Sequence, residues 1–468
     1  MGNPEIFSIK RCIIQERFDP HYHRPYFRRL VQRIRTKPFK RLGEIISQSS
    51  EVWGADSGLH QNTFPYIEIS AVGLGNNEYF VEIIPKKDAP SRARQVVRSG
   101  DILVSLTRPH RGAIAQVKKE HDGAIASTGF AVLRDLKSSS VDRDYLFNIL
   151  CTNICLDQFL QRSSGGNYPA ITPDQLDKVL IPLPEEAQQK EFAKKLQFAR
   201  SQQKAQFSQA DELLAGMDEF VLKTLQLSIP DYSKPKCFAR KSENVNGSRI
   251  DPHFHSPFFE RLLENIEASP IQKIPLGRLV QDIVGGATPT KGDSELYDTK
   301  GVKFLRILNI KPNEIYLNDV KYIQLHVHNG DLLRSQLQIN DVLMTITGRV
   351  GTAAVITEEI LPANINQHIV RLRITGDKCK PDYLAAYLNS SVGLALTNRG
   401  TSGGTRIAVD YPWIASLPIP LPSPGVQGEI IQEIKRIQKE CLRFRDGANR
   451  EWESAKQWFE EQLLKGAE

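Results

Sequence analysis

Two short segments carry one carboxylate and two imidazoles at alternating positions. One Asp-x-His-x-His run occupies 19–23, and a second occupies 251–255. Carboxylate oxygens and imidazole nitrogens suit ions such as zinc or manganese. Alternating residues of an extended segment point to opposite sides, so both could reach one ion only where the backbone bends. Because no further cluster of ligand residues is visible, we expect structural histidines at the start of a domain and no metal site.

The same two segments partly resemble the Asp-Pro-Pro-Tyr motif of adenine methyltransferases. They read DPHY at 19–22 and DPHF at 251–254, with His in place of the second Pro. Such an enzyme also needs a glycine-rich turn after a strand to hold S-adenosylmethionine, and the Gly-Leu-Gly at 73–75 stands without that context. Walker loops, HExxH motifs and serine-nucleophile elbows do not occur in the sequence. The sequence therefore predicts no catalytic residue and no cofactor site, and a stand-alone DNA methyltransferase or nuclease is the less favoured alternative.

A basic stripe follows the first of these segments. Residues 24–41 contain eight Lys or Arg and no acid. Such a stripe can follow the phosphates of a nucleic acid, and Arg28, Arg29 and Arg33 are the candidate contacts. The alternative is a solvated helix face, because the matching stretch near Glu260 does not repeat the basic pattern.

Polar turns supply the other candidate contacts. Each of two β-rich runs, 102–106 and 342–346, is followed by a turn that contains Gly and Arg, and two Ser-Gly-Gly loops begin at Ser164 and Ser402. Arg on guanine and Asn on adenine are strong pairs for reading base edges. The alternative, ordinary turn residues, is about equally plausible for any one position. The candidate base contacts are Arg108, Arg111, Asn167, Tyr168, Arg349, Thr405 and Arg406.

An internal duplication organises the chain. The segment RFDPHYHRPYFRRL at 17–30 matches RIDPHFHSPFFERL at 249–262, and GDILVSLT at 100–107 matches NDVLMTIT at 340–347. The Ser-Gly-Gly loops keep the same order. A period this long is that of a domain rather than of a solenoid repeat. Each copy mixes helical stretches with short strands and hairpins, so the predicted fold class is α+β.

Each copy ends in a proline-punctuated segment and a long heptad pattern. The segments are IPLP at 181–184 and PIPLP at 418–422. Beyond them, apolar residues recur at alternating steps of three and four, from Phe192 to Val221 and from Ile430 to Phe459. A single helix cannot bury such a stripe by itself, so we expect the two helices to pair as an antiparallel coiled coil. The alternative is two separate helices, each packed on its own domain.

Composition sets broader limits. The chain has 468 residues, a net charge of +7 and a pI near 8.9, which favours a polyanionic partner only weakly. No apolar run is long enough to span a membrane, and we expect no membrane contact. The six cysteines lack zinc-finger spacing. They are therefore expected to be reduced thiols of a cytoplasmic protein.

The whole pattern resembles the specificity subunit of type I restriction-modification enzymes. The carrying features are the matched hairpins at 100–107 and 340–347, the Ser-Gly-Gly loops, and the proline-led helices. The resemblance implies four parts: a first target recognition domain, a central spacer helix, a second target recognition domain and a C-terminal spacer helix. Their predicted boundaries are 1–184, 185–227, 228–422 and 423–468.

The resemblance also implies function and partners. The chain would be a non-catalytic reader of an asymmetric, bipartite site in double-stranded DNA. It would dock modification (methyltransferase) subunits and restriction subunits, and S-adenosylmethionine, ATP and Mg would be bound by those partners. The expected subunit interface consists of Gln189, Phe192, Leu196, Gln427, Ile430 and Ile434. The alternatives are a related two-subunit, type IIB-like system and, without nucleic acid, a coiled-coil scaffold.

Overall fold

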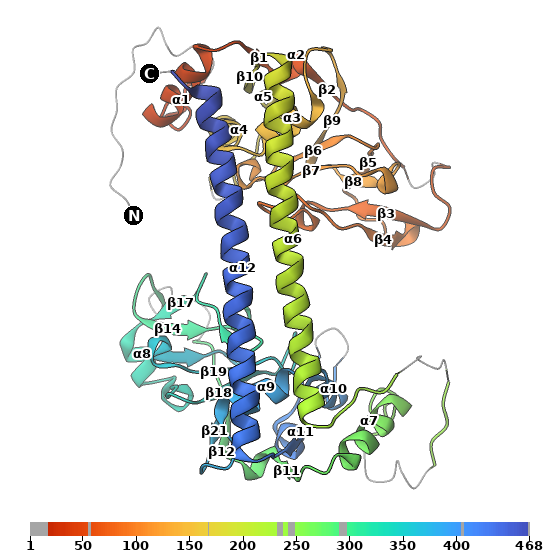
Figure 1. The fold of residues 1–468 in the computed structure, drawn as a ribbon, viewed down its shortest axis with the longest axis vertical. Helices are drawn as coiled ribbons and strands as arrows, with labels where there is room; N and C mark the ends of the chain where they lie inside the picture. The colour runs from red at the N-terminus through yellow and green to blue at the C-terminus, as the bar shows by residue number, and fades with distance from the viewer. Residues whose placement is uncertain are drawn as a thin grey trace. The chain divides into compact units, whose positions relative to one another are not determined.

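The chain forms two compact units in a computed structural model (Figure 1). Unit 1 comprises Met1–Ser208 and Phe444–Glu468, and unit 2 comprises Gln209–Arg443. Each unit contains half of each long helix. The structure describes residues 17–54, 58–166, 168–231, 237–241, 249–289, 297–403 and 407–466.

The central sheet of unit 1 is antiparallel, with strand order β2-β9-β6-β7. Its β6–β7 hairpin pairs Ile102 with Gln116, which confirms the predicted hairpin. All four residues of β6 are buried, as expected of a strand covered on both faces. The strands are β2 (Ile46–Gln48), β6 (Ile102–Ser105), β7 (Ile114–Gln116) and β9 (Phe130–Leu136).

A second sheet of unit 1 packs on one face of the first. Its order is β4-β3-β8-β5, with β3 and β8 parallel. Leu103 of β6 joins the apolar cluster between the sheets, whereas its neighbours Ile102 and Val104 join the helical core. Alternate side chains of one strand thus serve two cores. The strands are β3 (Thr63–Ile67), β4 (Glu82–Pro85), β5 (Ala93–Val96) and β8 (Ile125–Ser127).

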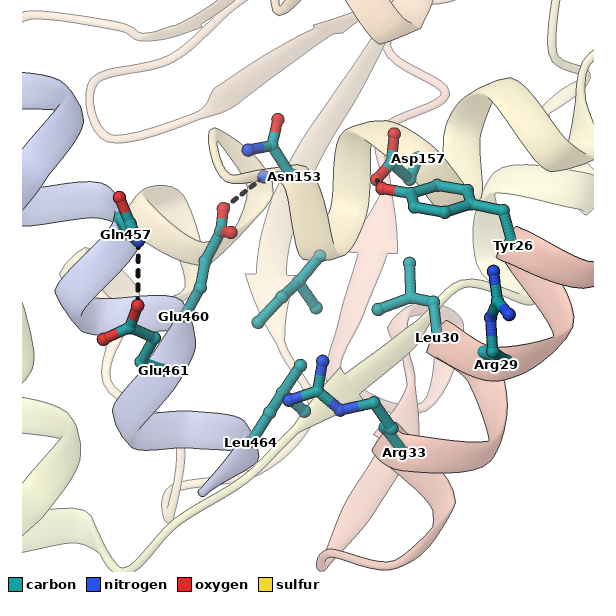
Figure 2. Close-up of a pocket in the computed structure, with 11 residues that line it drawn as sticks. Tyr26, Arg29, Leu30, Arg33, Asn153, Asp157, Gln457, Glu460, Glu461 and Leu464 are labelled. Atoms are coloured by element: carbon teal, nitrogen blue, oxygen red, sulfur yellow. Dashed lines mark hydrogen bonds between the residues drawn. The ribbon is translucent and has the colours of Figure 1, made fainter. Parts of the chain in front are cut away.

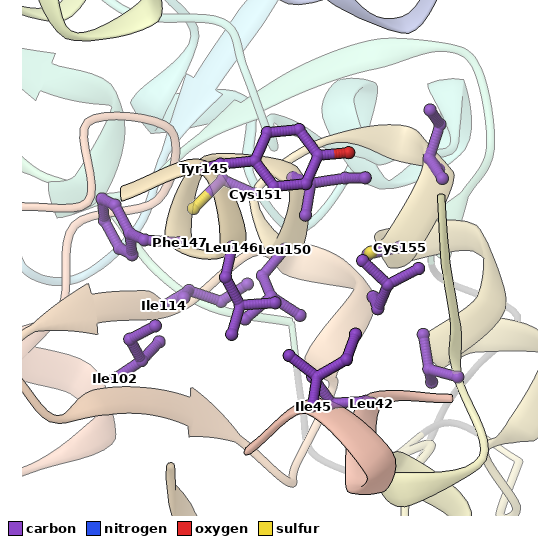
Figure 3. Close-up of a cluster of buried hydrophobic side chains, with 14 of the residues drawn as sticks. Leu42, Ile45, Ile102, Ile114, Tyr145, Leu146, Phe147, Leu150, Cys151 and Cys155 are labelled. Carbon is purple, nitrogen blue, oxygen red and sulfur yellow. The ribbon is translucent and has the colours of Figure 1, made fainter. Parts of the chain in front are cut away.

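Helices cover the other face of the central sheet. Figure 3 shows Tyr145 and Leu146 among the side chains of this core, with Ile102 and Ile114 from the sheet. The short strands β1 and β10 pair antiparallel. Their bounds and those of the helices are α1 (Pro25–Arg35), β1 (Phe39–Arg41), α2 (Leu42–Ile45), α3 (Arg143–Leu150), α4 (Asn153–Arg162), α5 (Pro173–Asp177) and β10 (Leu180–Pro182).

The helical stretch of residues 143–162 consists of two helices, and so does the matching stretch of unit 2. Thr152 is extended, with φ −97° and ψ 164°, and separates α3 from α4. The N–H of Asn153, at the start of α4, donates to Glu460 Oε1 at 2.6 Å, so a carboxylate from α12 (Pro424–Leu464) caps this helix. In unit 2, Asp218 Oδ1 accepts in the same way from Ser391 N–H at 2.8 Å. Both carboxylates come from distant segments, and in unit 2 the Ser390 hydroxyl adds a local cap by accepting from Gly393 N–H.

The central sheet of unit 2 has the order β12-β21-β18-β19 and is also antiparallel. Val342 and Met344 of β18 join the helical core, and Leu343 joins the cluster beneath the second sheet. This is the alternation seen in β6. The strands are β12 (Val280–Gly285), β18 (Val342–Thr345), β19 (Ala353–Val355) and β21 (Ile369–Ile374).

The second sheet of unit 2 has the order β13-β17-β14-β20, with β14 and β20 parallel. A small β15–β16 hairpin stands apart from it. The strands are β13 (Tyr297–Asp298), β14 (Val302–Leu305), β15 (Ile310–Lys311), β16 (Glu314–Ile315), β17 (Lys321–Ile323) and β20 (Ala363–Ile365). The remaining elements are α7 (Pro257–Ala268), β11 (Lys273–Pro275), α8 (Leu325–Asn329), α9 (Pro381–Asn389), α10 (Ser391–Arg399), α11 (Tyr411–Ser416) and β22 (Pro418–Pro420), with β11 and β22 antiparallel.

The two long helices are α6 (Glu186–Thr224) and α12 (Pro424–Leu464). In unit 1 the Phe192 ring packs against Trp458 and Phe459, with ring centroids 5.6 and 5.4 Å apart. In unit 2 Cys441 Sγ contacts the Ala210 carbonyl oxygen at 3.3 Å. Within each unit, therefore, the halves of α6 and α12 lie against each other (Figure 1). None of the described helices is long and apolar enough to cross a membrane.

Burial along α12 follows the heptad pattern closely. Seven of its stripe positions are buried: Ile430, Ile434, Ile437, Cys441, Ala448, Trp452 and Phe459. The stripe of α6 is less uniform. Gln203 is buried at the polar interruption, whereas Leu214 is 36% exposed. The ends of α6, rather than its middle, therefore supply most of its apolar burial.

Candidate nucleic-acid interface

The Asp-x-His-x-His segment of unit 1 is held by backbone contacts. Arg17 Nε donates to Asp19 Oδ2 at 2.7 Å, and the Nε2–H of His23 donates to the Arg17 carbonyl at 2.6 Å. His21 Nε2–H donates to the Leu160 carbonyl of α4 at 3.1 Å. These histidines therefore close a turn and fasten it to α4.

Unit 2 repeats these contacts. Arg249 Nε donates to Asp251 Oδ2 at 2.8 Å, and His253 Nε2–H donates to the Asn398 carbonyl at 2.9 Å. His255 Nε2–H donates to the Arg249 carbonyl. Among the described residues, no group of three or more His, Cys, Asp or Glu side chains is placed to hold a metal ion.

Two predicted loops of unit 1 meet to form one surface. The turn 107–112 joins β6 to β7, and the loop 163–170 follows α4. Thr107 forms a β-bridge with Ala170, and Arg108 N–H donates to the Pro169 carbonyl at 2.7 Å. These backbone bonds fix two segments that are far apart in the sequence. We call the described parts of these segments, 107–112 with 163–166 and 168–170, the unit 1 reading surface, because they carry base contacts predicted from the sequence.

Arg108 has an unusual conformation on this surface. Its φ of 49° lies in the left-handed region, where a non-glycine residue costs on the order of 1–3 kcal/mol. Its guanidinium carbon lies 4.1 Å from the centroid of the Tyr168 ring, which is 70% exposed. Arg111 is exposed beside it. Burial and the two neighbouring arginines lower the pKa of His110, which favours the neutral ring.

Unit 2 builds a corresponding surface. Its turn 347–351 pairs with the loop after α10 through the bridge between Thr347 and Ala408. The left-handed position is occupied by Gly348, with φ 68°, and Arg349 is exposed. We call this the unit 2 reading surface. The predicted contacts Asn167, Thr405 and Arg406 lie outside the described residues.

A third segment borders each surface, and its residues are not among the contacts predicted from the sequence. In unit 1 it is the β8–β9 turn, where Leu106 N–H donates to the Gly129 carbonyl at 2.7 Å and Thr128 is exposed. In unit 2 it is the β20–β21 turn, where Ile346 N–H donates to the His368 carbonyl at 3.0 Å and Gln367 is exposed. In the sequence, each of these turns is marked only by its place between two short apolar runs, which does not indicate a contact with the surface.

The basic stripe lies partly beside carboxylates. Arg29 and Arg33 of α1 line a cavity of about 410 Å³ together with Asp157 of α4 and Glu460 and Glu461 of α12 (Figure 2). Burial raises the pKa of Asp157 and of Glu460. These acids weaken the positive potential that the arginines would offer to phosphates. Arg28 is half-buried on the same helix.

The predicted subunit-interface residues are packed inside their own units. Gln189 Oε1 accepts from Asp142 N–H at 3.0 Å, and its Nε2 donates to the Pro184 carbonyl at 2.9 Å. Gln427 Oε1 accepts likewise from Lys380 N–H at 2.9 Å. All six side chains are buried: Gln189, Phe192, Leu196, Gln427, Ile430 and Ile434. Their role toward a partner stays a prediction, and exposed residues nearby would have to complete any such contact.

Comparison with known proteins identifies the family. The family model named type I restriction modification DNA specificity domain matches residues 39–203 and again residues 272–451. The chain therefore belongs to this family. Each match begins at or before the first strand of a unit and ends within a long helix.

Curated relatives carry the same designation. The chain is 31% identical over 134 residues to the type I restriction enzyme HindI specificity subunit of Haemophilus influenzae, which is 28% of this chain and 29% of that protein. It is 26% identical over 265 residues to the EcoBI specificity subunit of Escherichia coli, which is 56% of this chain and 52% of that protein. The matched stretches span about a third to a half of those relatives.

Solved structures include similar chains. One comes from work on complex assembly and conformational transition of the type I R-M system. It is 22% identical, with 92% of this chain and 98% of that chain covered and a TM-score of 0.47.

Proposed function

We propose that this chain is the sequence-specific DNA-recognition subunit of a type I restriction-modification enzyme. Each reading surface would contact one half of an asymmetric, bipartite site in double-stranded DNA. The carrying observation is the pairing of a turn and a loop in each unit, with exposed Arg111 and Tyr168 on one surface and exposed Arg349 on the other. Family membership supports the same proposal.

The base contacts in this proposal are short and local. Arg108 and Arg111 have the donors that pair with guanine, and Tyr168 offers a flat face beside them. In unit 2, Arg349 takes the corresponding role, and Asn167, Thr405 and Arg406 remain proposed contacts from the sequence. Because the two surfaces differ in side chains, the two half-sites should differ in sequence.

The proposed architecture is a repeat with paired helices. Residues 1–184 and 228–422 would be target recognition domains, and 185–227 and 423–468 would be spacer helices that form an antiparallel coiled coil. The shared order of the central sheets and the helix contacts within each unit support this. The helices would dock modification subunits, and restriction subunits would join that complex.

In this proposal the chain is not catalytic. S-adenosylmethionine, ATP and Mg would be held by the partner subunits. The absence of a cofactor-binding sequence motif supports this assignment. Matches to type I specificity subunits favour this system over the two-subunit, type IIB-like alternative.

Methylome sequencing of the host tests the proposal directly. The host is sequenced with the intact gene, without it, and with Arg111→Ala and Arg349→Ala variants. We expect one bipartite motif to lose methylation on deletion, because the partner subunits then lack their reader. Each variant should weaken the recognition of bases in one half of the motif only, and so lower methylation of sites that depend on those bases. Unchanged methylation after deletion would overturn the proposal.

A further inference from the structure

A buried asparagine connects α6 to the unit 1 reading surface. Asn77 lies in the left-handed region with φ 57° and is 8% exposed. Its Oδ1 accepts from Arg200 of α6 at 2.9 Å. Its Nδ2 donates to the Ile114 carbonyl at 2.9 Å and to the Gly112 carbonyl at 3.4 Å. Gly112 ends the turn that carries Arg108, which we call the reading turn of unit 1. The side-chain amide of Asn77 therefore links α6 to this reading turn.

Arg200 is itself held in place. Its guanidinium lies over the rings of Phe147 and Trp452, at 4.8 and 4.7 Å from their centroids. It also donates to Asn148 Oδ1 at 3.3 Å and to the Asn76 carbonyl at 3.4 Å. Stacking on two sides and a planar fork of donors restrict the rotamers of this side chain. The helix end of the connection is therefore rigid.

Unit 2 contains a related connection, which runs to α12 instead of α6 and uses the backbone of Asn313. Asn313 is also left-handed, with φ 59°. Its carbonyl accepts from Gln438 Nε2 of α12 at 3.0 Å, and its N–H donates to the Ala353 carbonyl at 2.9 Å. Asn389 Nδ2 donates to both Asn313 Oδ1 and the Ala353 carbonyl, at 2.9 and 2.8 Å. Ala353 begins β19, two residues after Gly351, which ends the turn that carries Arg349.

We propose that Asn77 with Arg200, and Asn313 with Gln438, are positioning residues that fix each reading turn on its long helix. This inference rests on the proposed DNA-reading function. Direct base contacts require side chains to be held within a fraction of an ångström, and a buried hydrogen-bonded amide supplies such a constraint. In unit 1 a left-handed Asn suits the position, because few other residues adopt that backbone and also bond in two directions through the side chain. In unit 2 the backbone N–H and carbonyl of the left-handed Asn313 make the corresponding bonds. The positioning residues touch no DNA themselves.

The test measures sequence discrimination by the assembled complex. The half-site of unit 1 is first assigned by exchange of its recognition domain. Methylation rates are then compared on the matched duplex and on duplexes with single-base changes in either half-site. Arg200→Met should lower discrimination about tenfold, roughly one lost base contact, in the unit 1 half only. Gln438→Met should do the same in the unit 2 half only.

Three further variants separate positioning from general stability. Arg200→Lys keeps a cation that can reach Asn77, and it should recover part of the discrimination. Asn77→Gly keeps the left-handed backbone but removes the amide, and it should match Arg200→Met. Lys204→Met removes the exposed ion pair with Glu78 one turn along α6, and discrimination should not change.

The outcomes distinguish this inference from the function on which it rests. A wild-type complex that does not discriminate at either half-site would overturn the proposed function. Normal discrimination by both Arg200→Met and Asn77→Gly complexes would overturn the positioning role alone. If the variants instead lost methylation equally on all duplexes and also had a lower melting temperature, Asn77 and Arg200 would only stabilise the fold. That result would also overturn the positioning role.

Discussion

The reading turns of the two units, 107–112 and 347–351, share a frame, but the second is one residue shorter and has a different residue at the first left-handed position. Both follow a buried central strand and end at a left-handed glycine, Gly112 with φ 73° or Gly351 with φ 95°. At the first left-handed position, unit 1 has Arg108 and unit 2 has Gly348. Glycine adopts that conformation readily, whereas arginine does so at a cost in free energy.

This difference separates what the turn needs for folding from what it would need for the proposed base contacts. The frame needs a left-handed residue to turn the chain, and glycine meets that need at the lowest free energy. Arg108 is held in this conformation by the bond from its N–H to the Pro169 carbonyl and by the Tyr168 ring beside its guanidinium. A strained residue on an exposed turn is typical of a functional site. Unit 1 therefore presents an arginine side chain, a proposed base contact, at the position where unit 2 has glycine.

Exchange of a whole recognition domain should have the largest effect. If residues 17–184 are replaced by the matching domain of a relative, one half of the methylated motif should change completely. The other half and the spacer should stay, because unit 2 and the helices are retained. Motif sequencing of the methylated genome measures this. A change in both halves, or in the spacer, would show that the two units do not read independently.

Charged substitutions at the contact between α6 and α12 should have the largest effect on stability. Phe192→Asp with Leu196→Asp should destabilise unit 1 by about 5 kcal/mol or more, because two buried apolar side chains are lost and two charges are buried unpaired. Hydrogen exchange should rise in residues 42–181 more than in residues 276–419. The matched variant, Ile430→Asp with Ile434→Asp, should reverse this pattern. Equal exchange in both units would contradict separate packing.

Substitutions at the left-handed position should have an intermediate effect. Arg108→Gly removes the side chain and the backbone strain together. Recognition of the unit 1 half-site should weaken by about 1–3 kcal/mol, the range for one bidentate base contact. The melting temperature should stay or rise slightly. Gly348→Ala is the control, with lower stability and unchanged base preference. Binding assays at one salt concentration measure the first effect, and a global loss of affinity for all DNA would indicate a phosphate contact instead.

Substitution of the carboxylate that caps α4 should have the smallest effect, which is a change in how stability depends on pH. Burial raises the pKa of Glu460, which caps α4, although the N–H of Asn153 acts in the opposite direction. Between the unfolded pKa of about 4.3 and the higher folded pKa, the native state binds more protons. The contribution of Glu460 to stability therefore falls as pH rises through this window. Glutamine does not titrate. The melting temperature of Glu460→Gln, measured relative to wild type, should therefore increase as pH rises through this window.

Calorimetry from pH 4 to 7 checks this sign. Asp157→Asn should act in the same direction, because burial also raises the pKa of Asp157. Glu460→Ala is the control for the cap itself, since it leaves the N–H of Asn153 without its acceptor. A pH-independent difference between Glu460→Gln and wild type would contradict the raised pKa.

Local patterns in the sequence determined several features of this protein. Heptad spacing located both long helices, and the apolar run from Ile102, with its glycine turn, predicted a hairpin that the structure contains. These features depend on residues close together in the chain, so periodicity and turn chemistry report them directly. The ordered repeat and the family resemblance also followed from the sequence.

Contacts between distant segments were decided only by the tertiary structure. The meeting of the Arg108 turn with the Tyr168 loop depends on backbone bonds between separate segments. Arg33 belongs to a basic stripe in the sequence, yet the fold places it in a cavity with Glu460 and Glu461. Asn77 is an ordinary loop residue until folding brings it to Arg200. Such partners have no fixed sequence spacing, because packing of the sheets and helices sets which residues meet.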